Sequence, residues 1–508
     1  MRDYHFGKFI QELREKRHLS QYQLGMLVGV SDKAVSKWES GASRPQSRIL
    51  CKLSTVLGVT VDELLTGQHN TFENETAKKT FLRKKELWAD AYRSLKVRYG
   101  DIPPIEVLNR YLSEYTELQY TDYILYFDLF RLLHARAGDM GEIIRIQGGI
   151  GASLAAFVTG ASETNPLPPH YYCPRCRRLE FVSDVSDGWD LPFRRCVCGE
   201  SMIGDGHNLP FETLLPSLHK KVRFSLSISL GMYEAFKEII CSCLAGQTVV
   251  ILDKKESPDL KTVFIPDREI PDIKSGQELS YEDHYEHFKK YPAITLFLSE
   301  ELTALSLMGK HTPVPLADVP FTEAGVLEAF CGNNTQGIPE FRTELVREMI
   351  SETSPHSFHD LIQLLGLAHG IGTWTDSTRR LIRLGLPAAG SIAYRDDIFC
   401  CIQDRLTEKG ISGAGLASKI TEDICRHRYA ESGLSAEMRQ YFDTLGLESW
   451  FADSIEKIHY AFPKAQGIQA LKYASILMWY KLHYPEAFKD TAYPGYVSSP
   501  PRHCPHNC

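Results

Sequence analysis

The sequence has no run of apolar residues long enough to cross a membrane, and its first residues, MRDYHFGKF, contain no apolar segment typical of a secretory signal. It has no excess of positive charge either, because 57 Lys and Arg against 64 Asp and Glu give a net charge of −7. It contains no internal repeat and no low-complexity tract. These absences argue against a membrane protein, a polycation and a repeat array. Any contact with nucleic acid must therefore come from local patches.

The composition predicts a globular protein of several domains. A chain of 508 residues corresponds to about three domains, each long enough to bury its own core. Its 43% hydrophobic and 24% charged residues are typical of soluble globular proteins. Thirteen cysteines without a secretory signal indicate a reducing cytoplasm, in which thiols or metal-bound cysteines are expected rather than disulfides. We therefore expect a cytoplasmic protein.

Two short cysteine pairs lie in the middle of the chain. Cys173 and Cys176 form a C-x2-C pair, and Cys196 and Cys198 form a C-x-C pair after an interval of nineteen residues. Tetrahedral zinc needs four soft ligands that converge from two turns, and this spacing predicts such a site. The second pair is shorter than the usual C-x2-C, which tightens that turn. The alternative is a relic knuckle with free thiols.

The first 67 residues predict five short helices. Ser20 and Ser31 are N-cap candidates for the second and third helices, and Gly29 permits a tight turn between them. Apolar residues recur at helical spacing, with Val35 and Trp38 on the buried side of the third helix. The expected helices cover residues 4–17, 21–28, 32–40, 47–57 and 60–65.

The segment LSQYQLGMLVGVSDKAVSKWESGASRP resembles the XRE (Cro/repressor-type) helix-turn-helix family along its whole length. The resemblance implies that the third helix lies in the major groove of double-stranded DNA and that the second lies over the backbone. It implies a phosphate contact for Gln21, and it implies a DNA-reading face made of Ser31, Lys33, Ala34, Ser36 and Lys37. Residues 1–67 hold ten Lys or Arg and seven Asp or Glu, a local charge of +3.

Two further expectations come from the same resemblance. Proteins of this family usually dimerise to read two half-sites, so a homodimer is expected. Gly25 occupies a position where the family prefers alanine, and both residues are small enough for the helices to cross. The alternative to DNA binding is a small helical bundle that contacts other proteins.

The segments that follow predict a mixed α and β region. Residues 68–80 are polar without apolar periodicity, which is typical of a linker. IQGGIGASLAAFVTG, at 146–160, predicts a glycine-rich turn that leads into an apolar helix. Residues 222–230 and 246–253 have the pattern of buried strands.

Several irregular motifs resemble the palm of the PolC-type DNA polymerase III alpha subunit. They are AYRSLKVRYGDIPPIEVLNRYLSEY at 91–115, the glycine-rich loop, and NPLPPHYYCPRC at 165–176 with the D-L-P, D-G-H and LPFET motifs after it. In the family the loop cradles the nucleotide triphosphate and begins Arg-Gly-Ser. Gln147 and Gly149 occupy the Arg and Ser positions here. An arginine clamps a phosphate with a charge-assisted fork, and a glutamine cannot.

The positions of the catalytic aspartates carry other residues. The family holds two magnesium ions with aspartates in P-D-I-D-L-N-F-S-G-E-Y and in L-D-I-L-G, and the resemblance places these at Phe224, Leu226 and Thr295. Two-metal phosphoryl transfer needs hard anionic oxygen ligands. Phenylalanine and leucine offer none. We therefore expect no magnesium and no polymerase chemistry.

The C-terminal part resembles the PolC fingers in three segments, at 337–374, 394–399 and 462–474. The resemblance implies contacts with template and incoming nucleotide for Arg347, His369, Arg395 and Lys464. Gln466 departs from the family, which has histidine there. The alternative is a surviving helical scaffold whose motif residues serve packing and caps. The acidic pair at 396 and 397 is accordingly expected to cap a helix or to pair with the preceding arginine.

Together these patterns predict a multidomain protein. The expected parts are an all-α helix-turn-helix domain (1–67), a linker (68–80), an α+β palm-like domain (81–330) with a zinc-knuckle-like insertion (173–198), a mainly α fingers-like domain (331–490) and a flexible tail (491–508).

The expected function is that of a sequence-specific, regulator-like DNA-binding protein with a truncated, degenerate and catalytically inactive polymerase III alpha-like region. Its expected cofactor is a structural zinc. Its expected partners are double-stranded DNA, a second copy and replication proteins, with no membrane. The alternative is a polymerase III alpha-type protein with residual DNA polymerase activity or a replication-associated role, such as a decoy that binds primer–template without turnover.

Overall fold

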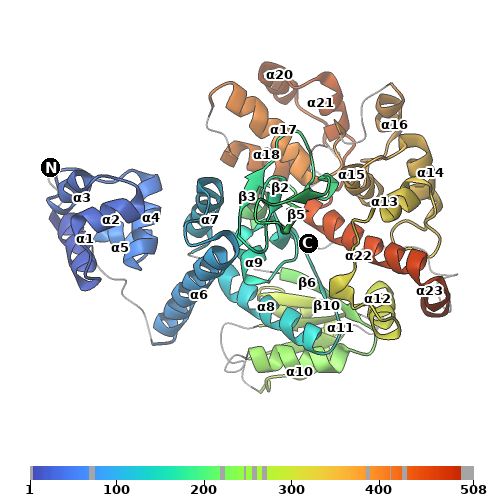
Figure 1. The fold of residues 1–508 in the computed structure, drawn as a ribbon, viewed down its shortest axis with the longest axis horizontal. Coiled ribbons are helices and arrows are strands. Elements are labelled where there is room, and N and C mark those ends of the chain that lie inside the picture. The colour runs from blue at the N-terminus through green and yellow to red at the C-terminus, as the bar shows by residue number, and fades with distance from the viewer. Residues whose placement is uncertain are drawn as a thin grey trace. The chain divides into compact units, whose positions relative to one another are not determined.

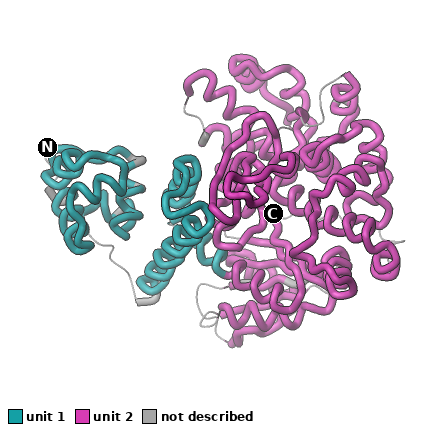
Figure 2. Tube along the Cα trace, in the orientation of Figure 1, with its two compact units in different colours: residues 1–128 teal, residues 129–508 magenta. Residues whose placement is uncertain are grey.

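The computed structural model describes residues 4–67, 75–119, 121–217, 223–244, 248–253, 260–265, 272–384, 390–411, 414–425, 429 and 432–492. The chain divides into two compact units, Met1–Asp128 and Leu129–Cys508 (Figure 2). Residues 68–74 of the predicted linker and 493–508 of the predicted tail lie outside the described residues. No helix in the described part of the chain is long and apolar enough to cross a membrane.

The five predicted N-terminal helices are confirmed. They are α1 (Tyr4–Lys16), α2 (Gln21–Val28), α3 (Asp32–Glu39), α4 (Ser47–Leu57) and α5 (Val61–Thr66). Ser20 and Ser31 are the N-caps of α2 and α3, and each side chain accepts a hydrogen bond from a backbone N–H of the first turn. Gly29 adopts φ 77°, the left-handed conformation that ends α2 and allows the tight turn. The helix α3 ends one residue earlier than expected.

The N-terminal helices share one core and one buried ion pair. Phe6, Ile10 and Leu13 of α1 pack in a cluster with Val35 and Trp38 of α3. At the edge of this core, Arg14 Nε donates to Glu39 Oε1 at 2.6 Å, and both side chains are at most 10% exposed. Gln21 Nε2 also donates to Glu39, at 2.8 Å to Oε2. Glu39 therefore joins α1, α2 and α3.

The helix after the predicted linker begins earlier than expected. The next helices are α6 (Glu75–Tyr99), α7 (Ile105–Leu118) and α8 (Tyr123–Asp139). The linker prediction is thus wrong for residues 75–80, because helical structure continues through that polar stretch. The two compact units divide at residue 128, so α6 and α7 group with the first unit rather than with the predicted palm-like domain.

The second unit contains a six-stranded mixed sheet (Figure 1). Its order is β1 (Arg145–Gln147), β6 (Arg223–Ser229), β10 (Ala293–Ser299), β8 (Leu260–Phe264), β7 (Val250–Asp253) and β9 (Gln277–Ser280). The strands β6 and β7 confirm the two predicted strands. Strands β6 and β10 are parallel neighbours, and the chain between them includes α10 (Tyr233–Cys243) and α11 (Tyr281–Phe288). Parallel strands require such a crossover connection. Strands β6 and β10 lie near α10, α11 and α12 (Glu300–His311) in Figure 1.

A second, small antiparallel sheet carries the cysteine pairs. Its order is β3 (Leu179–Phe181), β2 (His170–Tyr172), β5 (Ser201–Asp205) and β4 (Arg194–Arg195). Before it come the 3-10 turn η1 (Gly149–Ala152) and α9 (Leu154–Thr159), which confirm the predicted glycine-rich turn and apolar helix. The turns η2 (Gly188–Asp190) and η3 (Phe211–Ser217) lie within and after it.

Helices make up the rest of the second unit. They are α12 (Glu300–His311), the turn η4 (Leu316–Asp318), α13 (Ala324–Cys331), α14 (Glu344–Thr353), α15 (Phe358–His369), α16 (Asp376–Arg383), α17 (Arg395–Glu408), α18 (Ala414–Cys425), α20 (Ala436–Leu445), α21 (Ser449–Ile455), α22 (Lys464–His483) and α23 (Pro485–Ala492). The predicted fold class is confirmed: an all-α start, a sheet-containing middle and a mainly α end.

The predicted palm-like and fingers-like regions share a hydrophobic core. Leu302 and Phe330, from before residue 331, pack in the same buried cluster as Phe341 and Leu471, from after it. A domain boundary would expose this cluster to water. The predicted boundary at residue 330 therefore does not separate two compact bodies.

The buried ion pair of the first unit generates a stability prediction. Replacing Glu39→Ala leaves the Arg14 guanidinium buried without its carboxylate, so we expect the helix-turn-helix to lose about 3 kcal/mol of unfolding free energy. Glu12 is the matched control because it forms an exposed ion pair with Lys8. Glu12→Ala should change the free energy by less than about 0.5 kcal/mol. Chemical unfolding followed by circular dichroism measures both, and equal effects would contradict this account of the pair.

Candidate nucleic-acid interface and metal centre

The helix α3 presents a polar face to solvent. Lys33 and Lys37 lie one turn apart on this face, and both are exposed together with Ser36. On the opposite face Val35 and Trp38 are buried in the core, which fixes the rotation of the helix. The sequence thus places two cations and a hydroxyl on one accessible ridge.

The other predicted DNA-contacting residues lie at the beginning of α2 and α3. Ser31 Oγ accepts the backbone N–H of Ala34 at 3.3 Å, so its first role is to cap the reading helix. Ala34 is half-buried, and its side chain lies at the margin of the exposed face. Gln21 is held by its hydrogen bond to Glu39, which positions its amide at the N-terminus of α2. Gln21 and Ser31 are thus already bonded within the fold.

The contact between α2 and the turn before α3 is closer than expected. A Cβ atom on Gly25 would lie 2.7 Å from the carbonyl oxygen of Val30. The expectation that alanine would fit as well as glycine is therefore wrong for this backbone, because backbone atoms cannot move aside cheaply. Glycine at this position lets α2 approach the turn directly.

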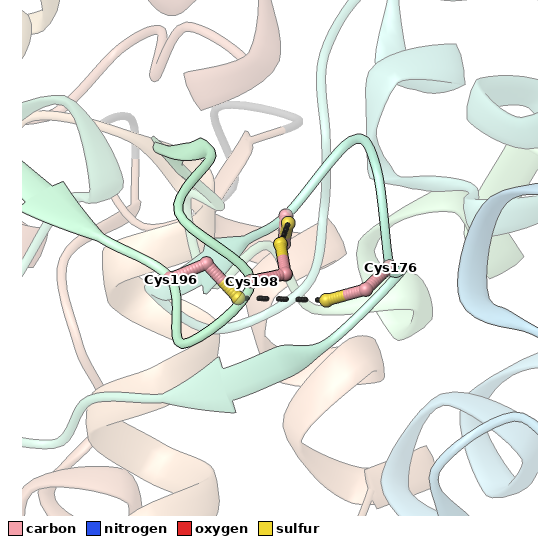
Figure 3. Close-up of side chains that lie close together, drawn as sticks. Cys176, Cys196 and Cys198 are labelled. Carbon is pink, nitrogen blue, oxygen red and sulfur yellow. Dashed lines mark hydrogen bonds between the residues drawn. The ribbon is translucent and has the colours of Figure 1, made fainter.

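The four cysteines of the two pairs converge, as predicted (Figure 3). Their sulfur atoms all lie within 4.8 Å of one another. Cys173 Sγ is 3.5 Å from Cys198 Sγ, and Cys176 Sγ is 3.4 Å from Cys196 Sγ. Four sulfurs around one zinc ion at 2.3 Å are separated by roughly 3.8 Å, so the cluster has the dimensions of a tetrathiolate site. The cluster can hold a metal ion.

The shorter second pair closes as well as the first. In the first turn the backbone N–H of Arg177 donates to the carbonyl of Cys173, and in the second the N–H of Gly199 donates to that of Cys196. Gly199 reaches this geometry with φ 87°, a conformation that glycine adopts without strain. The backbone N–H of Cys176 lowers the pKa of the Cys173 thiol to about 7, which favours a thiolate at that position, whereas hydrogen bonds with the neighbouring thiols raise the pKa of Cys176 to about 12.

The three predicted aspartate positions do not lie on one face of the large sheet. Thr295 pairs with Ser225 in the parallel register of β10 and β6, whereas Leu226 pairs with Leu296. Residues paired in register on adjacent strands point to the same face of the sheet, and successive residues of one strand point to opposite faces. Thr295 therefore shares a face with Ser225, and Phe224 and Leu226 point to the opposite face. Phe224 instead packs edge-to-face on Phe130 of α8, with ring centroids 4.8 Å apart.

The face that carries Thr295 is lined by hydroxyl and amide groups. Gln147 Nε2 donates to Ser227 Oγ at 3.1 Å, and the hydroxyls of Thr262 and Thr295 lie 3.4 Å apart. Two carboxylates border this face, and each is held by a cation. Lys310 Nζ donates to Glu142 at 2.6 Å, and Arg145 Nη1 donates to Glu301 at 2.8 Å. Burial raises the pKa of Glu301 to about 7 despite this pairing.

The glycine-rich loop is packed against the protein itself. A Cβ atom on Gly151 would lie 2.7 Å from the Cβ of Ala465 at the beginning of α22. One on Gly149 would lie 2.6 Å from Arg395 Nη2. The glycines of this loop therefore permit close approach to α22 and α17, in the region where the family is expected to hold a nucleotide.

Three of the four predicted fingers residues gather around one segment, and the fourth does not. The His369 ring stacks on Phe462 with centroids 5.5 Å apart, and the backbone N–H of Arg395 donates to the Phe462 carbonyl at 3.2 Å. Lys464, two residues further on, is 9% exposed. Arg347 lies on the exposed face of α14 and takes part in none of these contacts.

The predicted cap of α17 is confirmed, and His369 has an acidic partner. Asp397 accepts the backbone N–H of Tyr394 at 2.9 Å, and Asp396 accepts that of Lys464 at the same distance. His369 Nε2 lies 2.9 Å from Glu340. Burial would lower the pKa of His369, but the hydrogen bond to Glu340 raises it above its ordinary value. These groups are thus bonded to one another or to the backbone within the helical region.

Sequence reasoning missed a buried pair beside the small sheet. His207 Nδ1 lies 2.8 Å from Asp187 Oδ2, both are at most 1% exposed, and the Trp189 ring meets His207 edge-on. Asp190 accepts the backbone N–H groups of Phe358 and His359 and so caps α15. Burial raises the pKa of Asp190 to about 6. Asp190 begins the D-L-P motif and His207 ends the D-G-H motif. A short sequence motif alone does not indicate which residues come into contact in the fold.

Comparison with known proteins gives two family matches and several curated relatives. The family described as "Helix-turn-helix" matches residues 10–64, and the "Bacterial DNA polymerase III alpha subunit finger domain" matches residues 300–387. The second match spans the predicted boundary at residue 330, as the shared core does.

The relatives are curated proteins named "DNA polymerase III PolC-type". The protein of Thermotoga petrophila is 28% identical over 465 residues, which cover 77% of this chain and 33% of the relative. The protein of Ureaplasma parvum is 26% identical over 78% of this chain and 32% of its own length, and that of Staphylococcus aureus is 27% identical over 79% and 32%. The chain spans about a third of the length of these relatives. It thus carries an XRE-type helix-turn-helix domain followed by a region homologous to the PolC-type DNA polymerase III alpha subunit, including its finger domain.

Proposed function

We propose that this protein binds specific double-stranded DNA sites through α3 and that its polymerase-like region works without polymerase chemistry. The exposed ridge of Lys33, Ser36 and Lys37, on a helix whose opposite face is fixed by Val35 and Trp38, carries the first part of the proposal. A fixed helix with polar groups on its free face is the arrangement that reads base edges in the major groove.

The residues at the three aspartate positions support the second part of the proposal, the loss of polymerase chemistry. Phe224 and Leu226 are buried apolar residues, and Thr295 lies on the other face of the sheet. Glu142 and Glu301, which border that face, are each neutralised by a basic side chain. Two magnesium ions need several carboxylates directed at one point, and this sheet presents hydroxyls and amides there.

The cysteine cluster is proposed to hold a structural zinc ion. Its four thiols supply a closed set of soft ligands, with no ligand position left for water or substrate. Such an ion would fix the two turns of the small sheet, whose core around the cysteines consists of a few side chains such as Tyr171 and Met202.

Genomic selection tests the DNA-reading role. Fragmented genomic DNA incubated with the full-length protein should yield a small set of sites that share a symmetric motif, because a dimer reads two half-sites. Lys33→Ala with Lys37→Ala should abolish the enrichment and reduce the salt dependence of duplex binding by up to about two phosphate contacts. The matched control is Lys409→Ala with Lys419→Ala, which removes the same charge from exposed positions in the second unit. Enrichment that survives the α3 variant would refute the assignment.

Primer extension tests the loss of polymerase chemistry. No magnesium-dependent extension is expected from the full-length protein under conditions in which an authentic PolC polymerase extends the same primer. Restoring the aspartates by Phe224→Asp with Leu226→Asp should lower the melting temperature rather than create activity, because both positions are buried and the side chain at 224 packs on Phe130. Magnesium-dependent extension by the unmodified chain would favour the alternative, a polymerase with residual activity.

Metal analysis tests the zinc proposal. Purified protein should contain one zinc ion per chain by mass spectrometry, and Cys198→Ser should lose it. Cys401→Ser is the matched control because Cys401 is a half-buried cysteine of α17, outside the cluster. Removing the metal with a chelator should make the segment around residues 173–198 exchange its amide hydrogens faster, since metal binding contributes to folding. Full exchange protection in metal-free protein would mean that the thiols are free.

A further inference from the structure

In the cysteine-bearing segment the arginines are exposed to solvent, whereas several acidic residues are bonded within the fold. Residues 173–205 contain five arginines and six acidic residues, so the segment as a whole is not basic. Several of the acids are occupied within the fold: Asp187 is buried against His207, and Asp190 caps α15. Asn165 Nδ2 donates to Asp205 at 2.6 Å. All five arginines are exposed: Arg175, Arg177, Arg178, Arg194 and Arg195.

Three of the exposed arginines on the cysteine turns have no carboxylate partner in the described part of the chain. Glu180 is shared by two of them, with Arg178 Nε and Arg194 Nη2 within 2.7 Å of its two oxygens. Among the residues that the structure describes, the guanidinium groups of Arg175, Arg177 and Arg195 pair with no carboxylate. Glu180 thus pairs with two of the five cations, while Asp184, Glu200 and Asp205 add negative charge elsewhere in the segment. The other three arginines face solvent on the two turns that hold the cysteines.

An exposed aromatic ring lies within this basic surface. Phe193 is 74% exposed, and the Arg195 guanidinium lies over its ring at 5.9 Å. Val197, between the two cysteines of the second turn, is 85% exposed. A flat ring next to cations matches the two requirements of single-stranded nucleic acid, which are base stacking and phosphate neutralisation.

We propose that the surface of Arg175, Arg177, Phe193, Arg195 and Val197 is a second nucleic-acid site, and that its ligand is a single strand. In this site Phe193 stacks on a base and the unpaired arginines contact the adjacent phosphates. Its ligand class differs from that of α3, which reads duplex DNA, so the site does not depend on the proposed function of α3. It does not require polymerase activity either.

The test measures binding of a fluorescent twenty-nucleotide oligo-dT by anisotropy, with the full-length chain carrying Lys33→Ala and Lys37→Ala to remove the α3 contribution. Arg175→Ala with Arg195→Ala should weaken binding about ten-fold at low salt and reduce the salt slope by about 1.4, the value for two phosphates on a single strand. Phe193→Ala should weaken binding at least about five-fold and leave the salt slope unchanged, because stacking releases no counterions. Arg177 is left in place because its backbone has φ 61°.

The matched control is Arg136→Ala with Arg380→Ala, which removes two exposed arginines from elsewhere in the second unit. This variant should bind oligo-dT as the parent does. Equal losses in the control and the Arg175 variant would mean that general charge, not this surface, attracts the strand, and the proposal would fall. It would also fall if the Arg175 and Phe193 variants lost affinity for duplex DNA but not for oligo-dT. The same holds if polyglutamate competed with the labelled strand as well as unlabelled oligo-dT does, because charge alone would then explain the binding. Since the parent for these measurements lacks the α3 lysines, failure of the α3 assignment leaves the result unaffected.

Discussion

Burial of α22 on all sides is the constraint on which the second unit depends. Fifteen of its twenty residues are buried, and apolar or small residues occur around its whole circumference. A helix of this composition cannot lie on a surface, so other segments must cover every face. The helices α13 and α15, together with the turn η1, supply much of that cover. Two of the large side chains that α22 carries inward find polar partners: Tyr473 donates to the Ile144 carbonyl and Trp479 Nε1 donates to Glu323.

This constraint accounts for the close packing of the glycine-rich loop. The beginning of α22 needs close neighbours, and Gly151 permits Ala465 to approach to a distance that any side chain would prevent. Tyr394 similarly inserts between α15 and α22, where Gly366 and Gly467 leave room for its ring. Packing is thus sufficient reason for these glycines. A loop that resembles a phosphate-binding loop can be retained by the core behind it.

Local patterns in the sequence predicted local structure well. Ser20, Ser31 and the two cysteine pairs act over a few residues, and their caps and turns formed as expected. The face of the sheet to which Thr295 points could not be predicted in this way. It depends on the register between β10 and β6, two strands about seventy residues apart in the sequence. One residue of register reverses every side chain of a strand.

The boundary predictions failed for a related physical reason. Residues 75–80 are mostly polar, so their sequence shows no helical spacing of apolar residues. They nevertheless form the first turns of α6, because the end of a helix needs no buried face. The expected division near residue 330 followed the order of motifs along the chain. The core that joins Phe330 to Phe341 follows contacts in space, and contacts across long separations are not visible in motif order.

On the proposed function, the residues at the aspartate positions let the large sheet fold without magnesium. A two-metal site brings several carboxylates together, and without metal their repulsion and desolvation oppose folding. Phe224 replaces that cost with an edge-to-face contact to Phe130, and Leu226 is fully buried. The sheet therefore gains apolar burial at the point where an active polymerase would keep a strained, charged site. Without such a site, the free energy of unfolding of the polymerase-like region does not depend on the concentration of magnesium or nucleotide. This suits a region that must remain folded whenever the helix-turn-helix domain is bound to DNA.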